Sequence, residues 1–232
     1  PPEILRYVIA RSKVNRHIDF DTGSALFETA DEYERLVAAP PSGTEEGLSK
    51  RQRVAMETQL GAIRLSQVER GGDPADSIAG VSFRHLAMLS QVKSADADVW
   101  GSLQRSGHLE GEPREALVGR LARMRTWVDG PHFPEAARIV IQTEVSNEAR
   151  ASLSDEHRGF LSVLASALAN CEWGDEAINK CIRETSDEVG IGRHESYVAL
   201  YWVLLGRDYG PRVASIGAEM DRDDFLALIG GA

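Results

Sequence analysis

Hydrophobic residues recur at every third or fourth position over most of this chain, which is the spacing that one face of an α-helix requires. The clearest stripes cover residues 117–128, 160–168 and 195–205. The short apolar run Ile139-Val140-Ile141 has no clear period, and the helical pattern around it favours a helix there as well. From Val81 onward the pattern predicts helices and no strand.

Residues suited to helix ends stand at the borders of these stripes. Ser82, Ser154 and Asp221 each precede a stripe, where a side-chain oxygen can accept a hydrogen bond from a free backbone N–H. Gly190 and Gly206 each follow one, where glycine readily takes the left-handed conformation that ends a helix. These positions predict where several helices begin and end.

The first 70 residues carry, besides helical stripes, two segments in which polar and apolar residues alternate. One is His17-Ile18-Asp19-Phe20, and the other is residues 62–68, where Ile63 and Leu65 stand between polar neighbours. We predict strands at both. The expected order of elements is then helix, strand, helix, helix, strand. Thr22 is expected to cap the helix that follows the first strand.

The predicted fold class is mostly α, in two domains. Residues 1–78 form a small α+β unit, which the turn sequence Gly71-Gly72-Asp73-Pro74 closes. Residues 79–232 form an all-helical unit.

Composition agrees with a helix-rich globular protein, because 42% of the 232 residues are hydrophobic and only 6% are aromatic. No apolar run approaches the ~20 residues that a membrane-spanning helix needs, so no membrane partner is expected. The chain begins Pro1-Pro2-Glu3, without an initiator Met or a signal-peptide pattern, and we expect a fragment of a longer chain. The two cysteines, Cys171 and Cys181, are interpreted as buried thiols in helices of a cytoplasmic protein.

Residue types that often carry catalysis are present, but their spacing does not suit catalysis. Gly190-Ile191-Gly192 lies between predicted helices and does not follow a strand, as a phosphate-binding loop would. The histidines are scattered, and no set of four residues has the spacing of a zinc site. Helix first turns and solvated faces account for the carboxylates. We therefore predict no catalytic residue, no metal and no cofactor in this chain.

The net charge of −10 counts against indiscriminate binding to nucleic acid, and DNA is not an expected partner. A few well-placed basic residues can still form a local patch on an acidic protein. Arg114, Arg120, Arg123 and Arg125 give one predicted helix a basic side, which either follows phosphates or balances nearby acids.

Three separated stretches resemble class I lysyl-tRNA synthetases, and they occur in the order of that family. They are Pro2–Tyr7 with Ile18–Asp21 and Asp31–Leu36, then Val81–Leu86, and then Ala199–Tyr201 with Leu204–Arg207 and Gly210–Arg212. The first is similar to the segment after the family's KMSKS-type ATP-binding loop, and the third also resembles the final helices of glutamyl-tRNA synthetases. The resemblance covers nearly the whole chain.

This resemblance implies a catalytic domain, then a stem-contact fold, then a helical cage that binds the anticodon. Residues 1–78 would correspond to the stem-contact fold and residues 79–232 to the cage. The HIGH-type motif, the KMSKS-type loop and the lysine pocket are absent from this sequence, so the fragment alone is predicted to be inactive. ATP would serve only the catalytic domain of the parent enzyme, and the expected partner is a lysine-accepting tRNA.

The expected anticodon contacts are Arg207 and the run Gly210-Pro211-Arg212-Val213. Gly210-Pro211 suits a helix start, whose free N–H groups favour phosphate or base acceptors, and Arg212 adds a guanidinium that can stack on a base. In the glutamyl relatives the matching helix start lies against the anticodon. The alternative is an ordinary helix start followed by a solvated arginine.

Arg84 and His85, at a predicted helix start beside Phe83, are a second candidate contact. The alternative there is Phe83 in the core and Arg84 in a surface ion pair. For the chain as a whole, the sequence predicts recognition of the lysine tRNA anticodon. The other reading is a synthetase-derived helical protein-interaction module that no longer reads RNA, which the net charge of −10 favours.

Overall fold

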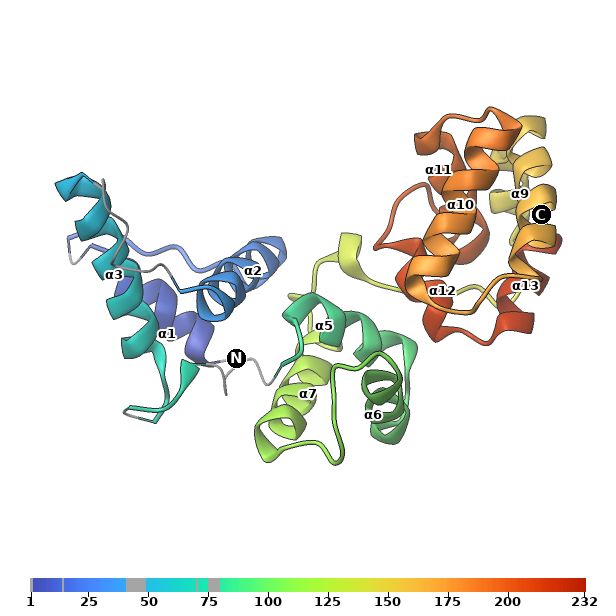
Figure 1. Cartoon of the computed structure of the whole chain (residues 1–232). Helices are drawn as coiled ribbons and strands as arrows, with labels where there is room; N and C mark the ends of the chain where they lie inside the picture. The colour runs from blue at the N-terminus through green and yellow to red at the C-terminus, as the bar shows by residue number, and fades with distance from the viewer. Residues whose placement is uncertain (1, 14, 41–48, 70, 75–79) are drawn as a thin grey trace. The chain divides into compact units, whose positions relative to one another are not determined.

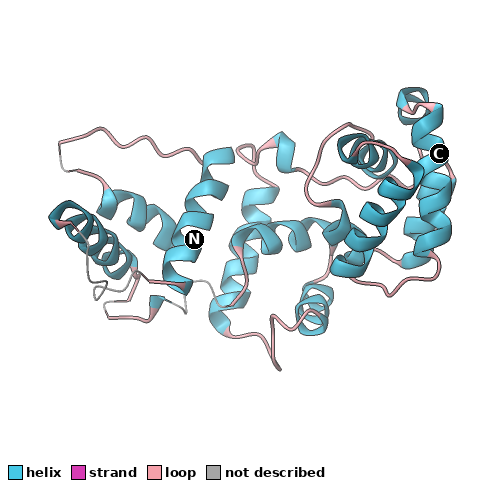
Figure 2. Cartoon of the chain, turned by 45° about the horizontal axis from the view of Figure 1, so that its top comes forward, coloured by secondary structure: helices cyan, strands magenta, loops and turns pink. Residues whose placement is uncertain are grey.

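The protein folds into two compact units, residues 1–134 (unit 1) and residues 135–232 (unit 2) (Figure 1). The computed structural model describes residues 2–13, 15–40, 49–69, 71–74 and 80–232. Within these stretches the regular secondary structure consists of twelve α-helices and one 3-10 turn, with no strand (Figure 2). The mostly α fold class is confirmed, and the predicted α+β character of residues 1–78 is wrong.

Six described α-helices make up unit 1. They are α1 (Pro2–Arg11), α2 (Ser24–Ala38), α3 (Lys50–Ser66), α5 (Phe83–Val92), α6 (Asp96–Arg105) and α7 (Glu115–Val128). α1 packs against α2 and α3, α2 also packs against α5, and α5 packs against α7. α2 joins these groups because it buries aromatic rings on two sides: Tyr33 lies 5.4 Å from Tyr7, and Phe27 lies 5.7 Å from Phe83, between ring centroids.

Unit 2 is a bundle of helices around an aliphatic core. Its elements are η1 (Glu135–Ala137), α8 (Asn147–Ser152), α9 (Asp155–Leu168), α10 (Asp175–Val189), α11 (Arg193–Leu205), α12 (Val213–Glu219) and α13 (Arg222–Gly230). α9 packs against α10, α11 and α13, and α12 packs mainly against α10. Leu164, Ile182 and Val203 lie fully buried where these helices meet, so the predicted stripes do form the core.

The second predicted strand is instead the last part of α3. Ala62, Ile63 and Ser66 are buried there, while the Leu65 side chain is 68% exposed. That burial follows the spacing of a helix. The alternation of Ile63 and Leu65 covers too few residues to specify a strand against a continuing helix.

Residues 17–20 are not a strand either; they have no regular secondary structure, and Ile18 is exposed. No strand exists in the described chain for this segment to pair with, and a strand is not stable alone. The predicted helix at residues 139–141 is also wrong. That segment lies in a loop that packs on the end of α11, where the N–H of Gln142 donates to the carbonyl of Leu204 at 2.9 Å.

The predicted helix ends are mostly confirmed. The side chains of Ser82, Ser154 and Asp221 accept hydrogen bonds from backbone N–H groups in the first turns of α5, α9 and α13. Gly190 and Gly206 end α10 and α11 in the left-handed conformation, with φ of 77° and 66°.

Thr22 does not cap α2 as predicted. The carboxylate of Asp21 does so, accepting from the N–H groups of Gly23 at 2.7 Å and Ala25 at 3.2 Å. These two hydrogen bonds hold the pKa of Asp21 below its usual value. Thr22 has a different role, since its carbonyl accepts a hydrogen bond from Nε1 of Trp127 at 2.8 Å.

The two packing units do not coincide with the predicted boundary after residue 78, because α5 packs with α2 inside unit 1. The division into a stem-contact unit and a cage stays a prediction. None of the described helices combines the length and the apolar character that crossing a bilayer would need.

Candidate nucleic-acid interface

The segment after α11 carries five of the predicted contact residues, and the end of that helix fixes where the segment starts. The Gln142 side chain donates to the carbonyls of Trp202 at 2.8 Å and Val203 at 2.9 Å. A Cβ added to Gly206 would lie 3.3 Å from the side-chain oxygen of Gln142. The free carbonyls of Trp202, Val203 and Leu204 at the helix end are therefore satisfied, and the chain leaves α11 in a defined direction.

Arg207 is anchored by the backbone of unit 2. Its guanidinium donates to the carbonyl of Glu135 at 3.0 Å and to the carbonyl of Arg138 at 2.5 Å. The central carbon of the guanidinium lies 4.6 Å from the ring centroid of Tyr209. The two terminal nitrogens of Arg207 therefore donate to the protein backbone, and the guanidinium supports the neighbouring aromatic ring.

Gly210 lies tightly against α11. A Cβ at this position would come within 2.5 Å of a Leu205 methyl carbon and 3.0 Å of the Tyr201 ring. Such distances are shorter than van der Waals contact, so a larger residue requires the Leu205 and Tyr201 side chains or the segment itself to move. Glycine is needed here for close packing rather than for an unusual backbone angle.

Pro211 precedes α12 without starting it, because the helix begins at Val213 and Arg212 occupies the N-cap position. The Arg212 guanidinium pairs with the Asp175 carboxylate at 2.5 Å, and the Ser215 hydroxyl donates to the other oxygen of that carboxylate. The Arg212 side chain is nevertheless 56% exposed, whereas Val213 is fully buried. Of these residues, Arg212 is the one that offers a side chain to a ligand.

Sequence reasoning missed Tyr209. The chain has six Phe, five Tyr and four Trp, all of them within the described residues, and Tyr209 is the only one that is exposed, at 48%. Its sequence signal was its position outside every apolar stripe, between Gly206 and Gly210. An exposed ring beside a guanidinium group is a combination on which single-stranded bases stack.

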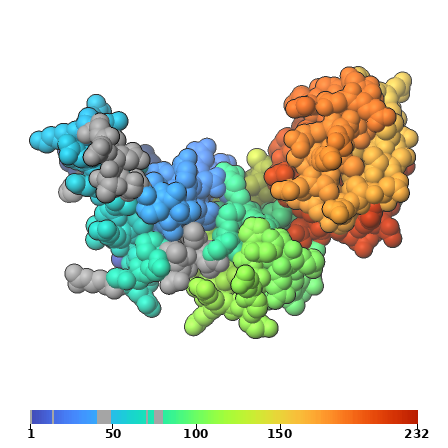
Figure 3. All heavy atoms as spheres, in the orientation of Figure 1, coloured from blue at the N-terminus to red at the C-terminus, as the bar shows by residue number. Residues whose placement is uncertain are grey.

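The charge of unit 2 limits how it could attract RNA. Unit 2 has 9 Lys and Arg against 17 Asp and Glu, whereas unit 1 has 17 against 19. Acidic side chains such as Glu176, Glu184 and Asp187 are exposed on α10, the orange helix on the visible surface of unit 2 in Figure 3. Attraction of RNA to this unit must therefore be local, at a few exposed basic groups.

The second predicted contact pair, Arg84 and His85, lies in unit 1 at the start of α5. Arg84 donates to the Asp31 carboxylate at 2.6 Å, and Phe83 is buried, so both features of the alternative interpretation are present. The His85 ring packs edge-on against His108 at 4.9 Å. The two candidate contacts therefore belong to different units.

Arg120 cannot belong to a phosphate-binding side of α7, because it is buried. It pairs with Glu34 at 2.5 Å and also donates to the carbonyl of Val81. Glu34 accepts a further hydrogen bond from the N–H of Phe83 at 2.8 Å. Burial raises the pKa of Glu34 and lowers the pKa of Arg120, although the ion pair acts in the opposite direction on each.

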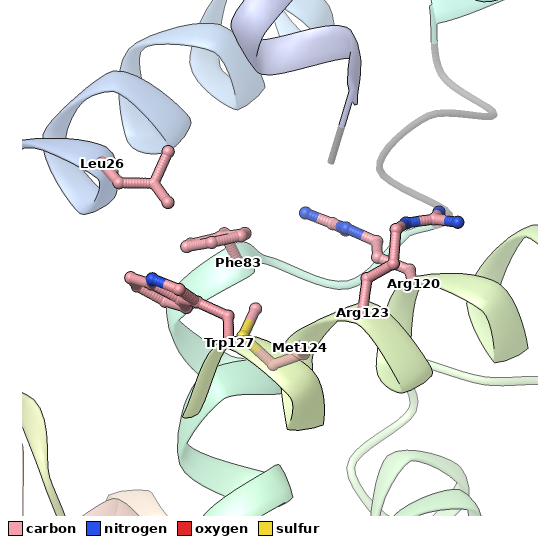
Figure 4. Close-up of a pocket in the computed structure, with 6 residues that line it drawn as sticks. All are labelled: Leu26, Phe83, Arg120, Arg123, Met124 and Trp127. Carbon is pink, nitrogen blue, oxygen red and sulfur yellow. The ribbon is translucent and has the colours of Figure 1, made fainter. Parts of the chain in front are cut away.

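A cavity of about 50 Å³ lies beside this ion pair, between α2, α5 and α7. It is lined by Leu26, Phe83, Arg120, Arg123, Met124 and Trp127 (Figure 4). A water molecule occupies roughly 30 Å³ in the liquid, and small-molecule pockets typically start near 300 Å³. The cavity is too small for a nucleobase, and we assign it to imperfect helix packing.

The two cysteines are half-buried rather than buried, and only Cys181 is in a helix, since Cys171 lies in the turn after α9. Burial and the neighbouring Cys171 thiol raise the pKa of the Cys181 thiol to about 11, so it is protonated at neutral pH. In the described part of the chain, no group of three or more His, Cys, Asp or Glu side chains is placed to hold a metal ion.

Comparison with known proteins identifies distant relatives of this helical chain. No family model matches. The chain is 30% identical to the lysine–tRNA ligase of Methanopyrus kandleri, 28% to that of Archaeoglobus fulgidus and 27% to that of Thermoplasma volcanium, each over 99% of the chain. It spans only 41–42% of the length of these relatives.

The chain is therefore a distant homologue of lysine–tRNA ligases along its whole length. This finding agrees with the resemblance to lysyl-tRNA synthetases. The correspondence with one region of those enzymes, and with anticodon binding, remains a prediction.

Proposed function

We propose that this chain is the tRNA-binding part of a class I lysine–tRNA ligase and that it reads the anticodon of a lysine-accepting tRNA. The observation that carries the proposal is similarity to lysine–tRNA ligases over 99% of the chain. Attachment of lysine with ATP is assigned to the rest of the parent enzyme, since the sequence contains no HIGH-type or KMSKS-type motif.

The proposed anticodon site is the segment Arg207–Val213 in unit 2. Arg212 is its main ligand group, because an exposed ion pair such as Arg212–Asp175 is worth only about 0–1 kcal/mol. A phosphate or a base edge can therefore replace Asp175 at little cost. Gly210 and Pro211 would offer backbone carbonyls, and the buried Val213 would offer only its backbone. Arg84 and His85 are proposed as a second contact, made by unit 1.

Chemical footprinting of lysine tRNA tests this proposal. The unchanged chain should protect the anticodon loop, and Arg212→Ala should weaken that protection. Arg193→Ala is the matched control, because Arg193 is also an exposed arginine of unit 2 in an ion pair, with Asp187 at 3.6 Å. An anticodon loop that stays unprotected, or equal losses with the two substitutions, would contradict the assignment.

One observation favours a second function, that of a helical protein-interaction module. Unit 2 has 17 acidic against 9 basic residues, which repels RNA at long range. In that case binding to lysine tRNA would be absent, or it would not weaken as salt rises. Measuring the binding constant at several salt concentrations separates the two functions, because each phosphate contact on a single strand contributes about −0.7 to the slope of log K against log salt.

A further inference from the structure

The Tyr209 ring is exposed to water, and packing against the protein does not compensate for this exposure. Every other Phe, Tyr and Trp of the chain is buried or half-buried, and all of them lie within the described residues. Single exposed apolar residues are common and need no explanation by themselves. A second feature of Tyr209 points to a ligand: it is held in place.

The holding group is Arg207. Its guanidinium lies 4.6 Å from the Tyr209 ring centroid and is itself fixed by the carbonyls of Glu135 and Arg138. The ring is thus covered by a fixed cation on one side and is still 48% exposed. An exposed side chain held in one orientation loses little further conformational freedom when a flat ligand stacks on it.

The next residues keep the ring at the surface. Gly210 follows Tyr209 directly and lies against Leu205 and Tyr201 with no room for a side chain. That tight contact restricts the backbone that follows Tyr209, and the two carbonyl contacts of Arg207 fix the guanidinium that lies over the ring. Arg212 then places an exposed guanidinium three residues further on.

We infer that Tyr209 is a stacking platform for one unpaired base of the bound RNA and that Arg207 is the residue that positions it. This inference rests on the proposed function and adds a contact that the sequence did not indicate. A base has a flat face for the ring, and Arg212, three residues further along the chain, is an exposed cation of the kind that pairs with phosphates. Stacking does not depend on net charge, which suits a unit that carries an excess of acids.

The test compares Tyr209→Phe with Tyr209→Leu in the full chain. Phe keeps the flat ring, whereas Leu keeps apolar bulk without it. The ligand is the anticodon stem–loop of lysine tRNA with 2-aminopurine placed at one loop position at a time, so that stacking quenches its fluorescence. Tyr209→Phe should bind as the unchanged chain does, and Tyr209→Leu should bind about 5- to 150-fold more weakly, the range expected for one base–aromatic stack.

The control is Val163→Ala, which removes another exposed apolar side chain of unit 2, 38% exposed on α9. It should leave both affinity and quenching unchanged. If Tyr209→Leu binds and quenches as Tyr209→Phe does, the platform is refuted while anticodon binding stands. If the unchanged chain binds the stem–loop no better than an unrelated RNA hairpin, the proposed function and the platform both fail.

The role of Arg207 is tested by Arg207→Lys, which keeps the charge but loses the planar group that spans two carbonyls. A positioning role predicts that quenching at the stacked base is lost while the salt dependence of binding stays the same. A direct phosphate contact predicts the reverse: Arg207→Lys would retain quenching, and Arg207→Gln would lower the salt slope by about 0.7.

Discussion

In unit 1, arginine side chains pair mainly with carboxylates. Arg120 forms its buried pair with Glu34, and Arg125 pairs with Asp96 at 2.9 Å while also donating to two backbone carbonyls. The 17 basic and 19 acidic residues of this unit nearly cancel.

In unit 2, arginines divide more evenly between carboxylates and backbone carbonyls. Four of them pair with carboxylates, namely Arg138, Arg158, Arg193 and Arg212. Arg207 donates to two carbonyls, and Arg222 donates to the carbonyls of Leu168, Ala169 and Cys171 at 2.5–3.0 Å where α9 ends. These arginines satisfy helix ends and loops, so they do not neutralise the acids of the unit, which outnumber its basic residues by 17 to 9.

The difference teaches that the acidic charge of unit 2 does not by itself decide whether it binds RNA. Arginines that are tied to carbonyls cannot neutralise phosphates, whereas Arg212 is exposed and only weakly held. Binding in this unit would then depend on one cation and one ring, and each can be removed without disturbing the core. In unit 1 the same holds for an exposed arginine such as Arg84, whereas loss of the buried Arg120 would damage the fold.

The largest expected effect breaks the buried pair of unit 1. Arg120→Met leaves Glu34 buried without its partner, which typically costs about 3–5 kcal/mol of unfolding free energy. Arg123→Met, on the exposed side of the same helix, should change it by less than about 0.5 kcal/mol. Urea denaturation followed by circular dichroism measures both. Equal effects of the two substitutions would show that the Arg120–Glu34 pair does not matter for stability.

The next effect is a pH dependence that Tyr7 gives to unit 1. Tyr7 is fully buried and donates to Glu32 at 2.9 Å, and burial with that hydrogen bond raises its pKa to about 12 from an ordinary value of 10. Because the unfolded chain loses this proton first, the stability that Tyr7 contributes is complete below pH 10 and is lost between pH 10 and 12, up to about 2–3 kcal/mol.

The matched variant is Tyr7→Phe, which has no proton to lose. Both proteins are denatured at a series of pH values from 8 to 12. The free energy of unfolding of the unchanged chain should fall relative to that of the variant as the pH rises. A constant difference across this range would contradict the raised pKa.

A smaller effect concerns the segment after α11. Gly210→Ala would force a methyl group against Leu205 and Tyr201 and should destabilise unit 2 by about 1–3 kcal/mol. Gly159→Ala on α9 is the control, because nothing lies within 4 Å of the added Cβ and the change should stabilise the helix by roughly 0.5–1 kcal/mol. The midpoint temperatures of thermal unfolding should move in opposite directions for the two variants. An unchanged midpoint for Gly210→Ala would mean that the close packing is not required.

The smallest effect on stability should come from Arg212→Ala. Its ion pair with Asp175 is exposed, so the unfolding free energy should change by less than about 1 kcal/mol. The same variant should lose affinity for lysine tRNA. A large loss of stability would instead make Arg212 a structural residue, as Arg120 is in unit 1.

The helix ends show what the sequence could predict. The caps at Ser82, Ser154 and Asp221 depend on a side chain and the backbone two or three residues away, and all three were predicted correctly. The strands at residues 17–20 and 62–68 were predicted from alternation over two or three positions, which a helix or an exposed loop can produce equally well.

The candidate site shows what the sequence could not reveal. Arg207 holds Tyr209 only because it reaches carbonyls 69 and 72 positions earlier in the chain. No local pattern reports a contact of that separation. The sequence therefore indicated the run from Arg207 to Val213 and missed its exposed ring.

Equilibrium binding of lysine tRNA, compared with the same tRNA carrying one substituted anticodon base, tests anticodon reading most directly. The substituted base loses its edge hydrogen bonds and its stacking, and this loss should weaken binding about 10-fold or more at fixed salt. Binding that is equally tight for both tRNAs, and for any other tRNA of the same length, would contradict anticodon recognition by this chain.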